Sequence, residues 1–253
     1  MKTPPLPGYY TTFRPFRDLF ATGTPVLTYH KLGPRPSRVR LKGLYVSQNL
    51  FRRQLQELKA AGYSSGSFDA PTDPPHGRRV ILSFDDGYVN VLRHGIQPLA
   101  EAGFTAIQFL PANLLGRAND WDIAKGEAPE PIMDVSLVRE WLAAGHDIGS
   151  HTCTHPFLTS LPPADAAEEI SASKKRLEDT FGRLINHFCY PYGDWNPAVR
   201  DMVEAAGYRT ACITESDMNS AATDRFALKR FTARYASRNW AWARGLITEM
   251  FQR

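Results

Sequence analysis

The chain is predicted to fold as an α/β barrel of seven or eight parallel strands in a single domain. Its length of 253 residues suits one such barrel. Four helix-like segments also end in the same way, with a glycine, then an aromatic residue or histidine, and then a strand-like stretch. These glycines are Gly62, Gly103, Gly145 and Gly207. Repeated helix–strand alternation predicts parallel strands covered by helices, and an open doubly wound sheet is the alternative.

Strand-like stretches follow the glycines and occupy the other apolar runs of the chain. The expected strands are 24–30, 63–68, 79–85, 104–110, 146–151, 187–191, 208–213 and, as an eighth, 227–232. The helix expected at 47–61 has an apolar stripe that includes Phe51 and Leu55. A helix at 165–181 begins with the capping-box-like pair Asp165 and Glu168, and a third has Asn196 as its N-cap.

The domain boundaries follow from composition along the chain. Residues 1–20 are expected to be a loosely attached N-terminal arm, and 21–253 to form the catalytic domain. Residues 111–134 form a long polar loop rich in proline and glycine, and loops of this length are often functional. Trp240 and Trp242 are expected to pack a final helix.

Bulk composition excludes several classes of protein. A net charge of +4, spread along the chain, is weak evidence for nucleic-acid or membrane binding. The three cysteines, Cys153, Cys189 and Cys212, contain no CxxC pair, which argues against a disulfide framework. No apolar run approaches the ~18 residues of a membrane span, and the N-terminus lacks the apolar core of a signal peptide. A cytoplasmic protein of open oligomeric state is expected.

Polar residues occupy the ends of four predicted strands. They are Tyr29–His30, Asp85–Asp86, His151 with His155, and the YPYG segment 190–193. In a parallel barrel the C-terminal strand ends converge on the face that carries the active site.

Two adjacent carboxylates at the end of a buried strand require compensation, because both repel each other and lose hydration. Two histidines four residues apart, together with one carboxylate, suit Zn²⁺ and leave a position for water. One aspartate would then bind the metal, and the other would take a proton from the metal-bound water. The alternative is that Asp85 and Asp86 only cap the following helix.

The segments SFDDG (83–87), SHTCTH (150–155) and FCYPYG (188–193) resemble the first three motifs of the polysaccharide deacetylase family. This is carbohydrate esterase family 4, whose core is the NodB homology domain, and the resemblance covers roughly residues 24–232. It implies a distorted (β/α) barrel, usually of seven strands. It also implies metal-dependent hydrolysis of N-acetyl, or sometimes O-acetyl, groups on amino sugars.

The resemblance implies a role for each motif residue. Asp85 would be the general base, and Asp86, His151 and His155 would be the metal ligands. Tyr192 would donate its backbone N–H to the tetrahedral oxyanion, in a turn held by Pro191.

Two features depart from the common family pattern. Cys189 stands where many members have an arginine that pairs with the base, and the usual late histidine is missing. A subset that includes the poly-N-acetylglucosamine deacetylases, whose domain looks circularly permuted, accounts for both. By resemblance to it, His30 would protonate the leaving amine, and Arg230, or its neighbour Lys229, would replace the arginine. The alternatives are that His30 merely ends a strand and that Arg230 lies on a solvated strand end.

The remaining site predictions concern aromatic residues. Trp121 lies in the NDWD segment, which resembles an NGWD segment of the same subset, and would wall the acetyl pocket or stack on a sugar. Alternatively, it only anchors the long loop. Trp195 and Tyr192 would also line the substrate groove.

The expected function is metal-dependent removal of N-acetyl groups from an amino-sugar-containing polysaccharide or glycoconjugate. The same site on a small intracellular substrate would hydrolyse another C–N bond, in a formamido sugar or a cyclic amide. The third possibility is a carbohydrate-binding protein with an inactive site. Zn²⁺ is the expected metal, although Co²⁺ or Ni²⁺ would fit the same ligands.

Overall fold

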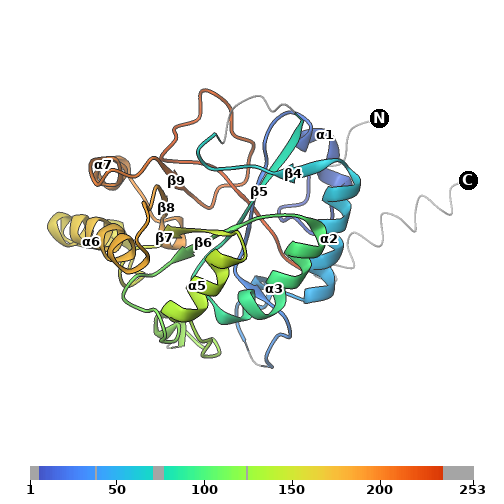
Figure 1. The fold of residues 1–253 in the computed structure, drawn as a ribbon. Coiled ribbons are helices and arrows are strands. Elements are labelled where there is room, and N and C mark those ends of the chain that lie inside the picture. Colours follow the sequence, from blue (N-terminus) through green and yellow to red (C-terminus); the bar gives the residue numbers. More distant parts are fainter. Residues whose placement is uncertain (1–5, 38, 71–76, 124, 236–253) are drawn as a thin grey trace, which may run out of the picture.

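The computed structural model describes residues 6–37, 39–70, 77–123 and 125–235, and a curved parallel sheet forms its centre (Figure 1). Seven strands follow one another in the order β10-β1-β5-β6-β7-β8-β9, and β4 pairs with the start of β5. The strands are β1 (Val26–Tyr29), β4 (Tyr63–Ser65), β5 (Arg78–Phe84), β6 (Ile107–Leu110), β7 (Asp147–Ser150), β8 (His187–Cys189), β9 (Thr210–Cys212) and β10 (Phe231–Thr232). Two short strands, β2 (Lys31–Leu32) and β3 (Tyr45–Val46), form a separate sheet.

The sheet curls into a partial barrel. Among the described residues its two terminal strands, β9 and β10, share no ladder. The two edges are joined by the isolated bridge between Cys212 and Leu228 and by hydrogen bonds such as that from the N–H of Arg230 to the carbonyl of Glu215 at 2.9 Å. The prediction of a distorted barrel of parallel strands is therefore confirmed. Each predicted strand is found at its place; β5 keeps the predicted length but begins one residue earlier, and the other seven are shorter.

Helices cover the outer face of this curved sheet (Figure 1). The longer ones are α2 (Gln48–Ala60), α3 (Val89–Ala102), α5 (Val135–Ala143), α6 (Pro163–Phe181) and α7 (Pro197–Ala205). The short helical segments are η1 (Arg14–Phe16), α1 (Arg17–Phe20), η2 (Lys42–Leu44), α4 (Asp120–Ile123), η3 (Leu158–Ser160) and η4 (Pro191–Gly193). All four glycines of the repeated phrase have positive φ angles, between 75° and 85°, which explains why glycine recurs there.

Helix α6 begins two residues earlier than predicted, and the predicted capping box is wrong. Its N-cap is Pro162, which makes no side-chain capping bond, and Pro163 occupies the first turn. Proline suits that position because its fixed φ is already helical and its missing N–H would have no partner there. Asp165 therefore lies inside the first turn. Asn196 does cap α7, accepting a hydrogen bond from the N–H of Val199 at 2.9 Å.

The described part of the N-terminal arm is packed rather than loosely attached. Tyr10, Phe16 and Phe20 are at most 1% exposed, and the N–H of Tyr10 donates to the carbonyl of Thr232 at 2.9 Å. Phe20 also packs against Phe231, with ring centroids 5.1 Å apart. Burial of several aromatic rings outweighs the effect of the prolines at the start of the chain. The domain division at residue 20 stays a prediction.

Other expectations of the chain's organisation have mixed outcomes. The loop at 111–134 is largely irregular, but it contains α4 and two isolated bridges, Tyr88–Ile132 and Ala118–Pro131. The three cysteines are buried and free. Trp240 and Trp242 lie outside the described residues. Within the described ranges, no helix is both long and apolar enough to cross a bilayer.

Candidate active site

The predicted site residues gather at the C-terminal ends of the barrel strands. His30 follows β1, Asp85 and Asp86 follow β5, His151 follows β7 and Tyr192 follows β8. The backbone is strained here: in the described chain, the non-glycine residues with positive φ are Asp86, Thr152, His155 and Tyr192, at 60° to 73°. Such strain persists only where surrounding structure enforces it, and it clusters at functional sites.

Asp86, His151 and His155 form a compact cluster. Asp86 Oδ1 lies 3.4 Å from Nε2 of His151 and 3.3 Å from Nε2 of His155. All three residues are at most 5% exposed, and their donor atoms lie within 4.8 Å of one another. The two imidazole nitrogens therefore face one carboxylate oxygen across a gap where a cation would meet all three.

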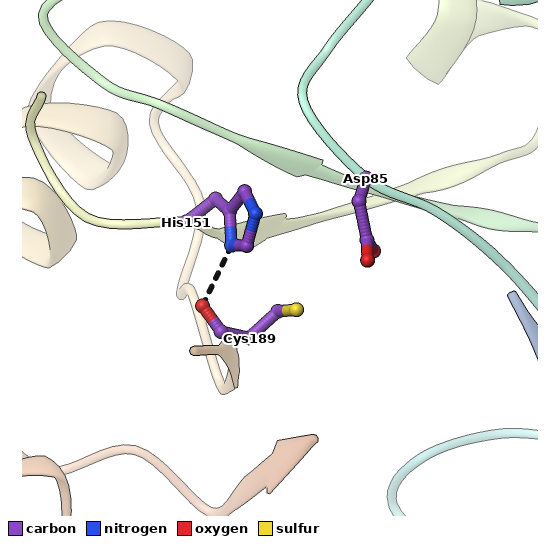
Figure 2. A group of neighbouring side chains, drawn as sticks. All are labelled: Asp85, His151 and Cys189. Atoms are coloured by element: carbon purple, nitrogen blue, oxygen red, sulfur yellow. Dashed lines mark hydrogen bonds between the residues drawn. The ribbon is translucent and has the colours of Figure 1, made fainter. Parts of the chain in front are cut away.

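The second nitrogen of His151 explains how this ring is oriented. His151 Nδ1 lies 2.7 Å from the carbonyl oxygen of Cys189, so it donates its hydrogen there (Figure 2). In the neutral form of the ring the hydrogen is therefore on Nδ1, and Nε2 can bind a metal; a hydrogen bond of this kind is the usual support of a metal-binding histidine.

The electrostatics of the cluster favour a positive charge. Burial by itself would raise the pKa of Asp86, but hydrogen bonds to His151 and His155 hold it well below its ordinary value. Burial would lower the pKa of His151, yet Cys189 and Asp86 raise it well above 6.5. Burial dominates at His155 and lowers its pKa, which keeps that ring neutral and able to act as a ligand.

A second set of donors, Asp85, His151 and Cys189, also lies within 4.8 Å (Figure 2). The Arg230 guanidinium already occupies it, because Nη2 lies 3.1 Å from the Cys189 sulfur and the same group binds both oxygens of Asp85. A cation there would meet a fixed positive charge. One carboxylate and two imidazoles, by contrast, match the ligand preferences of Zn²⁺. The Asp86 cluster is therefore the set that fits a metal.

Asp85 is held by a buried, bidentate ion pair with Arg230. Arg230 Nη1 and Nη2 each lie 2.8 Å from an Asp85 oxygen, and Arg230 is 0% exposed. Burial would raise the pKa of Asp85, but Arg230 outweighs it and the net pKa is lowered. Arg230 is thus not on a solvated strand end. Lys229, the other candidate, pairs instead with Asp217 on the surface at 3.1 Å.

His30 approaches Asp85 from the open side of the site. Its Nε2 lies 3.9 Å from Asp85 Oδ2, and its side chain is 21% exposed. Burial lowers its pKa below 6.5, although the two aspartates oppose this shift. The structure therefore places His30 beside the carboxylate, where one edge of the ring meets solvent. Its role as an acid stays a prediction.

The loop that carries the two histidines depends on Glu169, which sequence reasoning missed. From helix α6, its carboxylate accepts hydrogen bonds from the N–H groups of Cys153 and Thr154, both at 2.9 Å, and from Thr154 Oγ1 at 2.7 Å. These bonds fix the turn between His151 and His155. No local motif marks Glu169, because its partners lie on a different element.

Two of the three predicted aromatic residues contact His155 of the Asp86–His151–His155 cluster. Trp121 stacks on the His155 ring, with centroids 4.4 Å apart, and Tyr192 meets the same ring edge-on at 4.6 Å. The role of Trp121 in the acetyl pocket or in sugar binding stays a prediction. Trp195 packs near Tyr190, with centroids 6.2 Å apart, and its role in substrate binding stays a prediction.

A polar cavity of about 300 Å³ lies at the opposite, N-terminal ends of the strands. Ile107, Asp147 and His187, the first residues of β6, β7 and β8, line it. Within the described residues, neither set of donors able to hold a metal lies at this cavity. The chemistry thus concentrates at the C-terminal end.

A parallel α/β barrel with buried carboxylates and histidines at the C-terminal ends of its strands defines a barrel enzyme. The family model described as polysaccharide deacetylase matches residues 72–211, which is more than half of the chain. The chain therefore belongs to the polysaccharide deacetylase family.

Individual relatives agree with this assignment. The Bacillus subtilis protein YxkH, named as a polysaccharide deacetylase, is 25% identical over 81% of this chain and 70% of its own length. Two other curated relatives are matched over only 36% and 39% of their own length.

Solved structures share the fold. The Streptococcus pyogenes deacetylase PplD has a TM-score of 0.72 and 22% identity, covering 84% of this chain and 92% of its own. IcaB from Ammonifex degensii also has a TM-score of 0.72 and 22% identity, covering 87% and 97%.

Proposed function

We propose that this protein is a metal-dependent hydrolase that removes N-acetyl groups from an amino-sugar-containing polysaccharide or glycoconjugate. The observation that carries the proposal is the pairing of two groups at one strand end. Asp86 faces two imidazole nitrogens at 3.3 and 3.4 Å, while its neighbour Asp85 is ionised by a buried arginine. Asp86 is thus placed to bind a cation, and Asp85 is placed to accept a proton.

Asp86, His151 and His155 would hold the divalent ion, for which Zn²⁺, Co²⁺ and Ni²⁺ are the candidates. When bound, the ion would supply Lewis acidity, which polarises the substrate carbonyl and lowers the pKa of water. Three ligands from the protein would leave positions open for these oxygens.

Asp85 would act as the general base. Arg230 keeps the carboxylate ionised and fixes its plane with two hydrogen bonds. Oδ2 also accepts a hydrogen bond from the Thr28 hydroxyl at 3.4 Å, whereas Oδ1, within the part of the chain that the structure describes, accepts only from Arg230 and retains a lone pair for a proton. Asp85 would remove one proton from the attacking water while the oxygen of that water forms a bond to the acetamide carbon.

Two further groups would stabilise the charges that develop during the reaction. The backbone N–H of Tyr192 would donate to the tetrahedral oxyanion, in the strained turn after β8. His30 would deliver a proton to the nitrogen as the C–N bond breaks. The products are acetate and a free amine. His30 lies close enough to Asp85, at 3.9 Å, for both to reach one substrate amide.

Acetate release tests this proposal. The metal-stripped protein is titrated with Zn²⁺, Co²⁺ or Ni²⁺ and assayed on N-acetylated oligosaccharides, beside Asp86→Ala, His151→Ala and Asp85→Asn. We expect the first two variants to lose bound metal, and Asp85→Asn to keep metal while losing turnover. Formate release from formamido sugars would favour the alternative substrate. Oligosaccharide binding without metal uptake or acetate release would show an inactive binding protein.

A further inference from the structure

A row of aromatic rings leads from the candidate metal cluster to the protein surface. Tyr192 touches the ring of His155 with its edge, and Phe157 stacks flat on Tyr192, with centroids 3.9 Å apart and planes 10° apart. Phe157 is 45% exposed. Phe157 could not be predicted as a site residue, because nothing in the segment HPFLT (155–159) marks its ring as facing the site.

Hydrogen bonds between two strand-end loops hold this aromatic pair in place. Phe157 precedes η3 and Tyr192 lies in η4. Thr159 donates to the Asp194 carboxylate through its N–H at 2.8 Å and through Oγ1 at 2.7 Å. The next residue after Phe157, Leu158, is 1% exposed and anchors the segment. The exposed ring is therefore preorganised, which lowers the entropic cost of binding a ligand there.

Lys125 adds a hydrogen-bond donor at the edge of this pair. Its Nζ lies 3.3 Å from the Tyr192 hydroxyl, 4.7 Å from the Tyr192 centroid and 5.6 Å from the Phe157 centroid. Asp122, at 3.6 Å, partly balances the ammonium charge. The surface thus combines a flat apolar face with adjacent polar groups, which matches the apolar face and hydroxyl rim of a pyranose ring.

We propose that Phe157, with Lys125 at its edge, binds the sugar ring next to the one that is deacetylated. This inference rests on the proposed function and deepens it, because it assigns the enzyme to oligomeric rather than single-sugar substrates. The acetylated sugar would sit at the metal cluster, and its neighbour would stack on Phe157. The continuous ring row from His155 through Tyr192 to Phe157 sets the direction of the bound chain.

The experiment compares Phe157→Ala with wild type on N-acetylglucosamine and on its β-1,4- and β-1,6-linked tetramers. We expect KM for a tetramer to rise about three- to tenfold, the usual range for one aromatic stack, with kcat unchanged. Single-sugar kinetics should not change. Phe157→Tyr keeps an aromatic ring and should therefore keep the wild-type KM for the tetramers. Leu184→Ala removes a 70% exposed apolar side chain outside the aromatic row and should leave both substrates unaffected.

Equal kinetics of Phe157→Ala and wild type on both tetramers would overturn the subsite, and so would an equal loss on monomer and tetramer. The proposed function fails separately, if wild type releases no acetate with any of the three metals. In that case the affinity of wild type and Phe157→Ala for the tetramers, measured by calorimetry, tests the subsite. Weaker binding by Phe157→Ala supports the subsite, and unchanged binding or no binding by wild type refutes it.

Discussion

Replacing Arg230 by methionine tests the ion pair on which the proposed base depends. Methionine has a similar length and no charge, so it fills much of the same space while leaving the Asp85 carboxylate without its partner. Arg230 is 0% exposed, and it also donates from Nε to the Ile213 carbonyl at 3.1 Å. The guanidinium also donates to the Ser83 hydroxyl at 3.3 Å and to the Cys189 sulfur at 3.1 Å, so the substitution removes five hydrogen bonds from a buried region, two of them to Asp85.

The expected cost is about 3–5 kcal/mol of unfolding free energy, the range for breaking a buried ion pair by removing one partner. Lys229→Met is the matched control. Lys229 is the neighbouring residue and also pairs with an aspartate, but the side chains of Lys229 and Asp217 are 32% and 57% exposed. A pair of this kind contributes about 0–1 kcal/mol.

Urea unfolding of wild type, Arg230→Met, Asp85→Asn and the double variant measures the coupling directly. We expect the double variant to be more stable than the sum of the two single losses predicts, because it leaves no unpaired buried charge. The pH dependence of the activity of Arg230→Met should also change. Without the guanidinium, burial raises the pKa of Asp85, so the acid limb of its kcat/KM profile should move to higher pH.

A loss for Arg230→Met no larger than that for Lys229→Met would refute this reasoning. Additive losses in the double variant would do the same, because they would show that the two side chains do not depend on each other.

Three further predictions concern other parts of the site and the barrel. His30 has a pKa below 6.5, so kcat/KM should fall as pH rises through that pKa, and His30→Gln should abolish this limb in a pH–rate profile. Glu169→Gln removes the charge that holds the 151–155 turn, and we expect about 10–100-fold weaker zinc binding by competition with a chelator; unchanged affinity would contradict this support. Burial lowers the pKa of His146 from 6.5 to about 4 in the folded protein. Between these two pH values the unfolded chain takes up a proton at this histidine and the folded protein does not, so the free energy of unfolding is highest above pH 6.5 and decreases as the pH falls towards 4. Unfolding free energies across this range should drop by at most about 3 kcal/mol, and His146→Gln should flatten the dependence; equal slopes would contradict the assignment.

The barrel could be predicted because its signals are local. Four strands directly follow a helix that ends in a left-handed glycine, and the other four are short apolar runs, so all eight strands could be located from signals within a few residues. The start of α6 could not, because Asp165 and Pro163 both suit a helix N-terminus and sequence pattern alone does not choose between them.

The site was predictable to the extent that motifs mark it. The positions of Asp86, His151 and His155 follow from the strand ends. Arg230 could be predicted because Cys189 stands where many family members have an arginine, so another arginine was needed to pair with Asp85. The contribution of Glu169 could not be predicted, because its partners belong to another element. The packed arm was missed for a related reason: Tyr10 and Phe20 have no helical or strand period that shows what they pack against. The roles assigned to the site residues stay predictions.

The position of Arg230 beside the last strand of the described chain has a consequence for how the protein matures. Arg230 directly precedes β10, the last strand of the described chain, and β10 pairs with β1, one of the earliest. A ribosome would therefore synthesise Asp86, His151 and His155, the proposed metal ligands, well before it supplies Arg230, the partner of the proposed base Asp85. Under the proposed roles, a nascent chain would be able to bind a metal ion before β10 docks and would become active only afterwards. Activity would then report on completed folding, whereas metal uptake would not.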